Sequence, residues 1–159
     1  RVVGNRLQWV TETPPIGMAH RWLNTAGVAD FDGDGRLELA LVVTPHIGGI
    51  LKIYQLRRDR LVEEWRAPGF SNHAMGSRNL DLALVTSGRD QPVLVLPNGR
   101  RTGLRKVFFK DGACRAVDLP LTQGLPITTL GAKKVDTHGR VEVTYTVENG
   151  TTGSVRLNF

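Results

Sequence analysis

The segment "ADFDGDGRLELALVV" constrains the fold of this chain most, because an acidic loop runs directly into an alternating apolar stretch. The acids are Asp30, Asp32, Asp34 and Glu38. Every second residue from 37 to 43 is leucine or valine, which is the pattern of a strand with one strongly apolar face. The acidic loop is therefore predicted to precede a strand and not a helix.

Four like charges in one short loop repel each other, and this repulsion favours a bound cation. Calcium takes roughly six to eight oxygen ligands, on loops whose glycines let the backbone wrap around the ion. Gly33 and Gly35 provide such turns. An EF-hand is disfavoured, because its twelfth position requires a glutamate and here holds Leu41. A solvated acidic turn without an ion is the alternative interpretation.

The run "GVADFDGDGRLELALV", followed by "GGILKIYQL", resembles the FG-GAP or VCBS-type repeat, which is the blade unit of integrin-alpha-like β-propellers. The resemblance covers residues 25–56. It implies that the loop binds calcium through its first, third, fifth, seventh and ninth residues. The family more often has Asp at the ninth position, so this chain departs from the pattern there. The implied calcium ligands are Asp30, Asp32, Asp34, the backbone carbonyl of Arg36, and Glu38.

Two later segments resemble the strand that follows the acidic loop. "LELALV" at 37–42 matches "LDLALV" at 80–85, and "GRLELALV" at 35–42 matches "GRVEVTYT" at 139–146. The loops before the later copies, at 72–79 and 136–139, lack most of the acids, so we expect no calcium there. The repeats predict one β-propeller-type domain over 1–159. Its blade-like units are expected at 22–70, 71–119 and 120–159, with a strand at 1–21 that comes from or completes another blade.

Composition and turn signals predict an all-β fold, and the resemblance together with the repeats implies a partial β-propeller of three four-stranded antiparallel blades. The chain has 159 residues with 18 glycines and 8 prolines, which suits short strands joined by many turns. Propellers usually have roughly four to eight blades. We therefore expect the missing blades to be supplied by a longer chain or by another copy. Strands are predicted at 6–12, 22–29, 37–43, 50–56, 60–66, 80–86, 92–96, 104–109, 113–119, 127–135, 140–147 and 153–158.

The basic charge of the chain raises a nucleic-acid hypothesis, with a net charge of +6 and a pI near 10.1. The cations form separate short clusters at 57–60, 100–106 and 133–134, and no nucleic-acid motif accompanies them. Solvated charges at turns, or an anionic partner such as an acidic glycan, explain these clusters better. Nucleic acid is thus an unlikely partner. No apolar run is long enough to predict a membrane span.

Catalytic chemistry has only weak support in the sequence. His20, His46 and His73 recur at similar spacing, and three histidines could bind zinc, but their turn-like settings favour hydrogen bonds to backbone carbonyls. No hydrolase or metalloprotease motif is present, and we assign no catalytic residue. Cys114 is the only cysteine and is interpreted as a small core residue.

The sequence therefore predicts a calcium-binding, non-catalytic β-propeller module that binds a protein or a glycan. Its location is expected to be extracytoplasmic, that is periplasmic, secreted or on the cell surface, because weak extracellular calcium loops need calcium that the cytosol lacks. The alternative is the propeller portion of a secreted hydrolase or lyase whose catalytic residues lie outside this chain. A basic nucleic-acid binder is a third hypothesis.

Overall fold

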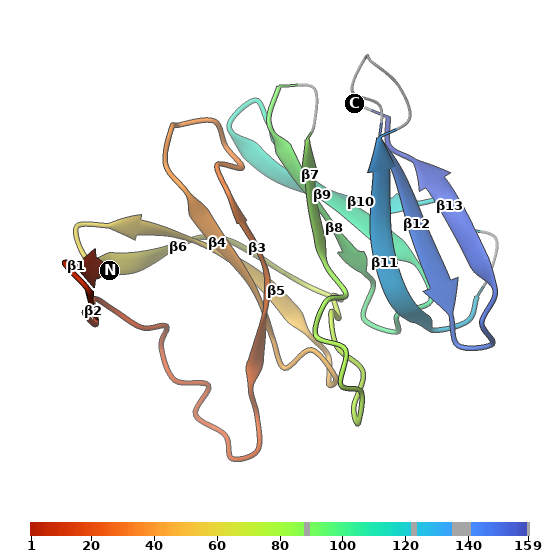
Figure 1. The fold of residues 1–159 in the computed structure, drawn as a ribbon, viewed down its shortest axis with the longest axis horizontal. Helices are drawn as coiled ribbons and strands as arrows, with labels where there is room; N and C mark the ends of the chain where they lie inside the picture. Colours follow the sequence, from red (N-terminus) through yellow and green to blue (C-terminus); the bar gives the residue numbers. More distant parts are fainter. Residues whose placement is uncertain (88–89, 122–123, 135–140, 159) are drawn as a thin grey trace.

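The computed structural model describes residues 1–87, 90–121, 124–134 and 141–158. All regular elements in these ranges are strands, and none of the ranges contains a helix, which confirms the predicted all-β class. No helix that could cross a membrane therefore occurs in this part of the chain. The strands form four antiparallel sheets, each built from strands that are neighbours in sequence (Figure 1).

The first sheet is a four-stranded meander of β3 (Leu23–Ala29), β4 (Glu38–Val43), β5 (Ile50–Arg57) and β6 (Arg60–Pro68). β5 and β6 are joined by the two residues Arg58 and Asp59, which both have positive φ, 47° and 62°. Such a two-residue turn matches the right-handed twist of the strands that it joins. The acidic loop connects β3 to β4 at one end of this sheet.

The second sheet is another four-stranded meander. The third has three strands in the described ranges, where a four-stranded blade was predicted. The second contains β7 (Leu84–Ser87), β8 (Pro92–Pro97), β9 (Leu104–Lys110) and β10 (Ala113–Leu119). The third contains β11 (Ile127–Lys134), β12 (Val141–Val147) and β13 (Thr152–Arg156). The short strands β1 (Val2–Val3) and β2 (Arg6–Leu7) pair only with each other among the described residues.

The second sheet lies between the other two (Figure 1). Side chains from both of its faces are buried, one set in the core shared with the first sheet and one set in the core shared with the third. Strand β8 makes this clear, because successive side chains of a strand point to opposite faces. Leu94 and Leu96 belong to the core shared with the first sheet, whereas Val93 and Val95 belong to the core shared with the third. All four are at most 4% exposed. The run "PVLVLP" is therefore apolar without alternation because neither of its faces meets water.

The first and second sheets approach each other closely at Gly27. A Cβ atom built on Gly27 would lie 2.2 Å from Cγ2 of Val85, so no larger residue fits without movement. Strand β7 also lies against β11 of the third sheet. The first strands of the three sheets, β3, β7 and β11, are thus successive neighbours.

Most predicted strands are present, but two predictions are wrong in detail. The strand predicted at 6–12 is limited to Arg6–Leu7, and the strand predicted at 80–86 begins only at Leu84. The segment before Leu84 is held by asparagine side chains instead of a strand ladder, since Asn24 donates to the Leu80 carbonyl at 2.9 Å. Asn79 in turn accepts from the backbone N–H of Asp81 at 2.8 Å.

This difference also affects the repeat alignment. "LELALV" forms most of β4, the second strand of the first sheet. "LDLALV" ends in β7, the first strand of the second sheet, so these two segments are not equivalent in the fold. "GRVEVTYT" extends over β12, which is the second strand of the third sheet and thus matches β4 in position. The loop at 136–139 lies outside the described residues.

Candidate metal centre

The acidic loop is anchored to the first sheet at both of its ends. Phe31, 1% exposed, places its ring in the core between the first and second sheets. Glu38 begins β4 and is completely buried, and its Oε2 accepts a hydrogen bond from the Phe31 N–H at 2.7 Å. The two ends of the loop are therefore held together by a buried carboxylate.

Between these anchors the backbone curls around Asp30. Its Oδ1 accepts from the N–H of Gly33 at 2.7 Å, and its Oδ2 accepts from the N–H of Gly35 at 3.0 Å. Both glycines have positive φ, 79° and 83°, a region that residues with a Cβ rarely adopt. Asp32 and Asp34 each accept from the N–H two residues further along the chain. The sequence thus folds into a chain of tight turns whose carboxylates lie close together.

Three of the acids form a group that could hold a metal ion. Carboxylate oxygens of Asp30, Asp32 and Glu38 all lie within 4.8 Å of one another, and no other group of three such side chains occurs in the described ranges. Calcium–oxygen distances are about 2.3–2.6 Å, so oxygens on opposite sides of one ion lie up to about 5 Å apart. The spacing and the all-oxygen chemistry of the trio therefore fit a hard divalent cation.

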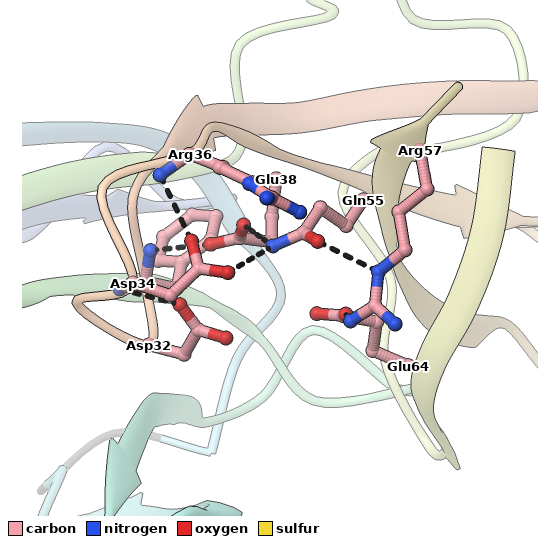
Figure 2. Close-up of polar contacts among 8 residues, drawn as sticks. Asp32, Asp34, Arg36, Glu38, Gln55, Arg57 and Glu64 are labelled. Atoms are coloured by element: carbon pink, nitrogen blue, oxygen red, sulfur yellow. Dashed lines mark hydrogen bonds and ion pairs between the residues drawn. The ribbon is translucent and has the colours of Figure 1, made fainter. Parts of the chain in front are cut away.

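Asp34 is not part of this trio, because Gln55 of β5 holds it from the neighbouring strand (Figure 2). The Gln55 Nε2 donates to Asp34 Oδ2 at 2.9 Å and to Glu38 Oε1 at 3.0 Å. Arg57 fixes the orientation of this amide by donating to Gln55 Oε1 at 2.7 Å, and Arg57 also pairs with Glu64. Arg36 is exposed, and its backbone N–H donates to Asp34 Oδ1 at 2.8 Å.

The surroundings of Glu38 and Asp34 shift the pKa values of these two carboxyl groups in opposite directions. Burial raises the pKa of Glu38, and the hydrogen bonds from Gln55 and Phe31 only partly oppose this effect. The charges of Asp32 and Glu64 raise the pKa of Glu38 further. The hydrogen bond from Gln55 lowers the pKa of the exposed Asp34. Within the trio, Glu38 is thus a buried acid whose charged form is disfavoured by its surroundings and favoured by a cation.

The acidic loop also contacts the second sheet. Gln91, which precedes β8, donates from Nε2 to the Asp32 carbonyl at 2.5 Å. A Cβ atom on Gly33 would lie 2.5 Å from the same nitrogen, so the contact depends on a glycine at position 33. The loop is therefore part of the contact between the first and second sheets.

Sequence reasoning missed Gln55, Arg57, Glu64 and Gln91. One signal was available for Gln55, because it shares the inward face of β5 with Leu51 and Ile53 and is itself completely buried. A polar residue on an apolar face needs a buried partner. Nothing in the sequence indicates the contact of Gln91, which lies 59 positions from Asp32.

The histidines do not gather into a three-ligand site in the described ranges. His46 and His73 contact Trp22, with ring centroids 5.9 and 4.6 Å apart. The buried His73 has its Nε2 3.0 Å from the Ser77 carbonyl, which is the backbone contact that its turn-like setting predicted. His20 is exposed and has a φ of 56°.

The fold and the site thus define an all-β chain of stacked sheets with an acidic trio able to hold a metal ion. Comparison with protein-family models, with curated proteins and with solved structures found no match to this chain.

Cys114 packs against the core between the first and second sheets, and burial raises the pKa of its thiol to about 12. Because the thiolate is the reactive form, we expect a thiol reagent at pH 8 to modify the folded chain at least about a hundredfold more slowly than an unstructured cysteine. Unfolding in denaturant should restore the ordinary rate. Equal rates in the two states would contradict the burial of Cys114.

Proposed function

We propose that this chain is a calcium-binding, non-catalytic module of the FG-GAP or VCBS type, which binds a protein or a glycan outside the cytoplasm. The proposed calcium ligands are the carboxylates of Asp30, Asp32, Asp34 and Glu38, with the carbonyl of Arg36. The trio of Asp30, Asp32 and Glu38 is the observation that carries this proposal, because three carboxylates within 4.8 Å are costly without a cation.

Calcium suits this loop better than other common ions. The ligands are all hard oxygens, and zinc prefers imidazole and thiolate. Magnesium demands compact octahedral geometry and gives up its waters reluctantly. The loop uses its backbone N–H groups to orient the carboxylates of Asp30, Asp32 and Asp34, which leaves further lone pairs on the oxygens for an ion. This arrangement supports a flexible shell of the kind that calcium accepts.

A structural role for the ion explains the surroundings of the site better than a catalytic role. Both oxygens of Glu38 already accept hydrogen bonds, from Phe31 and from Gln55. A carboxylate that is buried and doubly hydrogen-bonded is poorly placed to exchange protons with a substrate. Its contacts instead join the loop to β4 and β5, so an ion held there would tie three parts of the first sheet together.

The partial propeller is supported by the stacking of the three sheets. Each sheet is a meander, and the first strands β3, β7 and β11 are successive neighbours, as the inner strands of propeller blades are. We propose that a longer chain or another copy supplies the remaining blades. A location outside the cytoplasm follows from calcium supply, since a loop with a Kd on the order of 10⁻⁴–10⁻³ M stays empty at cytosolic calcium levels.

Calorimetric titration tests the metal directly. The native chain is expected to bind one calcium ion with a Kd on the order of 10⁻⁴–10⁻³ M, and magnesium more weakly. Asp32→Asn should weaken calcium binding by at least about tenfold, because it removes one charge from the trio. Asp81→Asn is the matched control, because Asp81 is exposed and follows Leu80, which is held by Asn24 at the end of β3 opposite to the acidic loop. Equal affinities of the two variants, or no calcium binding by the native chain, would refute the proposed site.

A further inference from the structure

A cavity of about 650 Å³ lies at one end of the second sheet. Its lining includes Gln91, whose side chain also contacts the acidic loop at the Asp32 carbonyl. It is lined by the chain before and at the start of β8, by the second half of β9, and by the β9–β10 turn. Figure 1 shows the start of β8 and the β9–β10 turn at the same end of this sheet. Pockets that bind small molecules have volumes of about 300–1,000 Å³. The cavity is thus large enough for a ligand of one to three sugar rings.

The floor of the cavity combines an aromatic ring with cations. Phe108 and Arg115 lie directly opposite each other on β9 and β10, so their side chains share one face of the sheet. Lys106, two residues before Phe108 on the same face, places its Nζ 4.9 Å from the centroid of the Phe108 ring. Lys106 also donates to the carbonyl of Asn158, which lies beyond the end of β13. The ring is therefore flanked by positive charge.

Two further cations, Lys110 and Arg115, line this cavity. The side chains of Lys110 and Arg115 are exposed, and within the described part of the chain neither makes an ion pair or a hydrogen bond. The cavity also contains the carboxylates of Asp90 and Asp111. The three cations outnumber these two acids, so the cavity favours a ligand with one negative charge and hydroxyl groups over a polyanion.

From this combination we infer that the cavity binds an acidic saccharide, a sugar ring that carries a carboxylate. Arg115 pairs with the carboxylate through its planar guanidinium, which matches two carboxylate oxygens at once. The Phe108 ring packs against the apolar face of the sugar, and Asp90 and Asp111 accept hydrogen bonds from its hydroxyls. The inference rests on the proposed binding role of the module but not on the metal.

A nucleic acid is a poorer fit for this site. Binding of a phosphate backbone requires a row of cations that follows the strand. Here the two acids among the lining residues repel a polyanion, and the other basic clusters of the chain lie at separate turns. A ligand with a single carboxylate is repelled less, and the three lining cations outnumber the two acids.

The test is an NMR titration of the labelled native chain in calcium buffer with trigalacturonic acid and with its methyl ester, which has the same rings without the charge. The acid is expected to shift the amide signals of β9, β10 and their turn, and to bind at least about tenfold more tightly than the ester. Inorganic phosphate at the same concentration is expected to shift these signals only weakly. A phosphate response equal to that of the acid would overturn the assignment of a sugar.

Two variants locate the site. Arg115→Ala should weaken binding of trigalacturonic acid about tenfold or more, and Lys110→Ala should weaken it by a smaller factor. Arg100→Ala removes the same charge from the β8–β9 turn, at the opposite end of the sheet, and should leave the affinity within about twofold. All three positions are at the surface or in turns, and circular dichroism checks that each variant folds.

The outcomes separate this inference from the proposed function. No binding of the acid at millimolar concentration, or equal binding of acid and ester, overturns the inferred ligand. Shifts that map to another surface overturn the site while leaving the binding role of the module intact. Calcium binding is measured in a separate calorimetric titration, so its result does not depend on the result with the saccharide.

Discussion

Replacing Leu94 with alanine is expected to lower the free energy of unfolding by about 2–5 kcal/mol, which is the usual cost of emptying a leucine site in a core. Leu94 is completely buried on the central strand pair of the second sheet and packs in the core shared with the first. For a chain of this size, the melting temperature should fall by roughly 5–15 °C. Thermal and denaturant unfolding, followed by circular dichroism, measure both quantities.

Val117→Ala is the matched control within the same sheet. Val117 lies on β10 at the edge of the sheet and is 40% exposed. Its truncation should cost less than about 1 kcal/mol, because much of the removed surface already meets water. If the two variants lose similar stability, the second sheet is not buried between the other two as described.

The strands and turns of this chain could be predicted because their signals are local. Strand β4 and the two-residue turn between β5 and β6 depend on neighbouring residues, and both occur where the pattern placed them. The alternation did not predict the buried face of β4, because Ala40 and Val42 lie in the core between the first two sheets while Leu37 is 63% exposed. The unbroken apolar run of β8 predicts a strand as well. That its two faces belong to two different cores follows only from the stacking of the sheets.

The candidate site was predictable only in part, because some of its contacts are local and others join distant segments. The spacing of Asp30, Asp32 and Glu38 in one loop indicates that the three acids can converge, and they do. Asp34 instead contacts Gln55, a residue from another strand, and this contact depends on the register of β4 against β5. The docking of Gln91 onto the loop depends on how two sheets pack. Contacts between distant segments leave little trace in a single sequence.

The segment before β7 shows how side chains can override a strand pattern. "LDLALV" alternates as "LELALV" does, but Asn24 and Asn79 satisfy the backbone around Leu80 and Asp81 with side-chain hydrogen bonds. Leu82 still buries its side chain, at 1% exposure, in the core shared with the third sheet. The apolar pattern therefore predicted the burial of Leu82 correctly, but it did not predict that Leu80 is 49% exposed, and it placed the start of the strand four residues too early.

The proposed calcium ion should make the stability of the chain depend on free calcium. An ion that binds only the folded state adds RT ln(1 + [L]/Kd), which is about 2.7 kcal/mol when free calcium is a hundred times Kd. At that calcium concentration, addition of a chelator should lower the melting temperature of the native chain by roughly 5–10 °C. Magnesium at the same concentration should restore little of this loss, because it does not suit a loose shell of carboxylates.

The Asp32→Asn variant distinguishes a bound ion from a solvated acidic turn by the sign of its effect. The asparagine oxygen can still accept from the Asp34 N–H, as Asp32 Oδ1 does at 3.0 Å, but the trio loses one charge. In chelator the variant should therefore melt at or above the native chain, because repulsion with Asp30 and Glu38 is relieved. In calcium it should melt below the native chain, because an ion ligand is weakened. The order of the two melting temperatures thus reverses between the two buffers. Native melts that are identical in calcium, magnesium and chelator, together with an Asp32→Asn variant that is more stable in all three, would mean that the four acids form only a solvated turn.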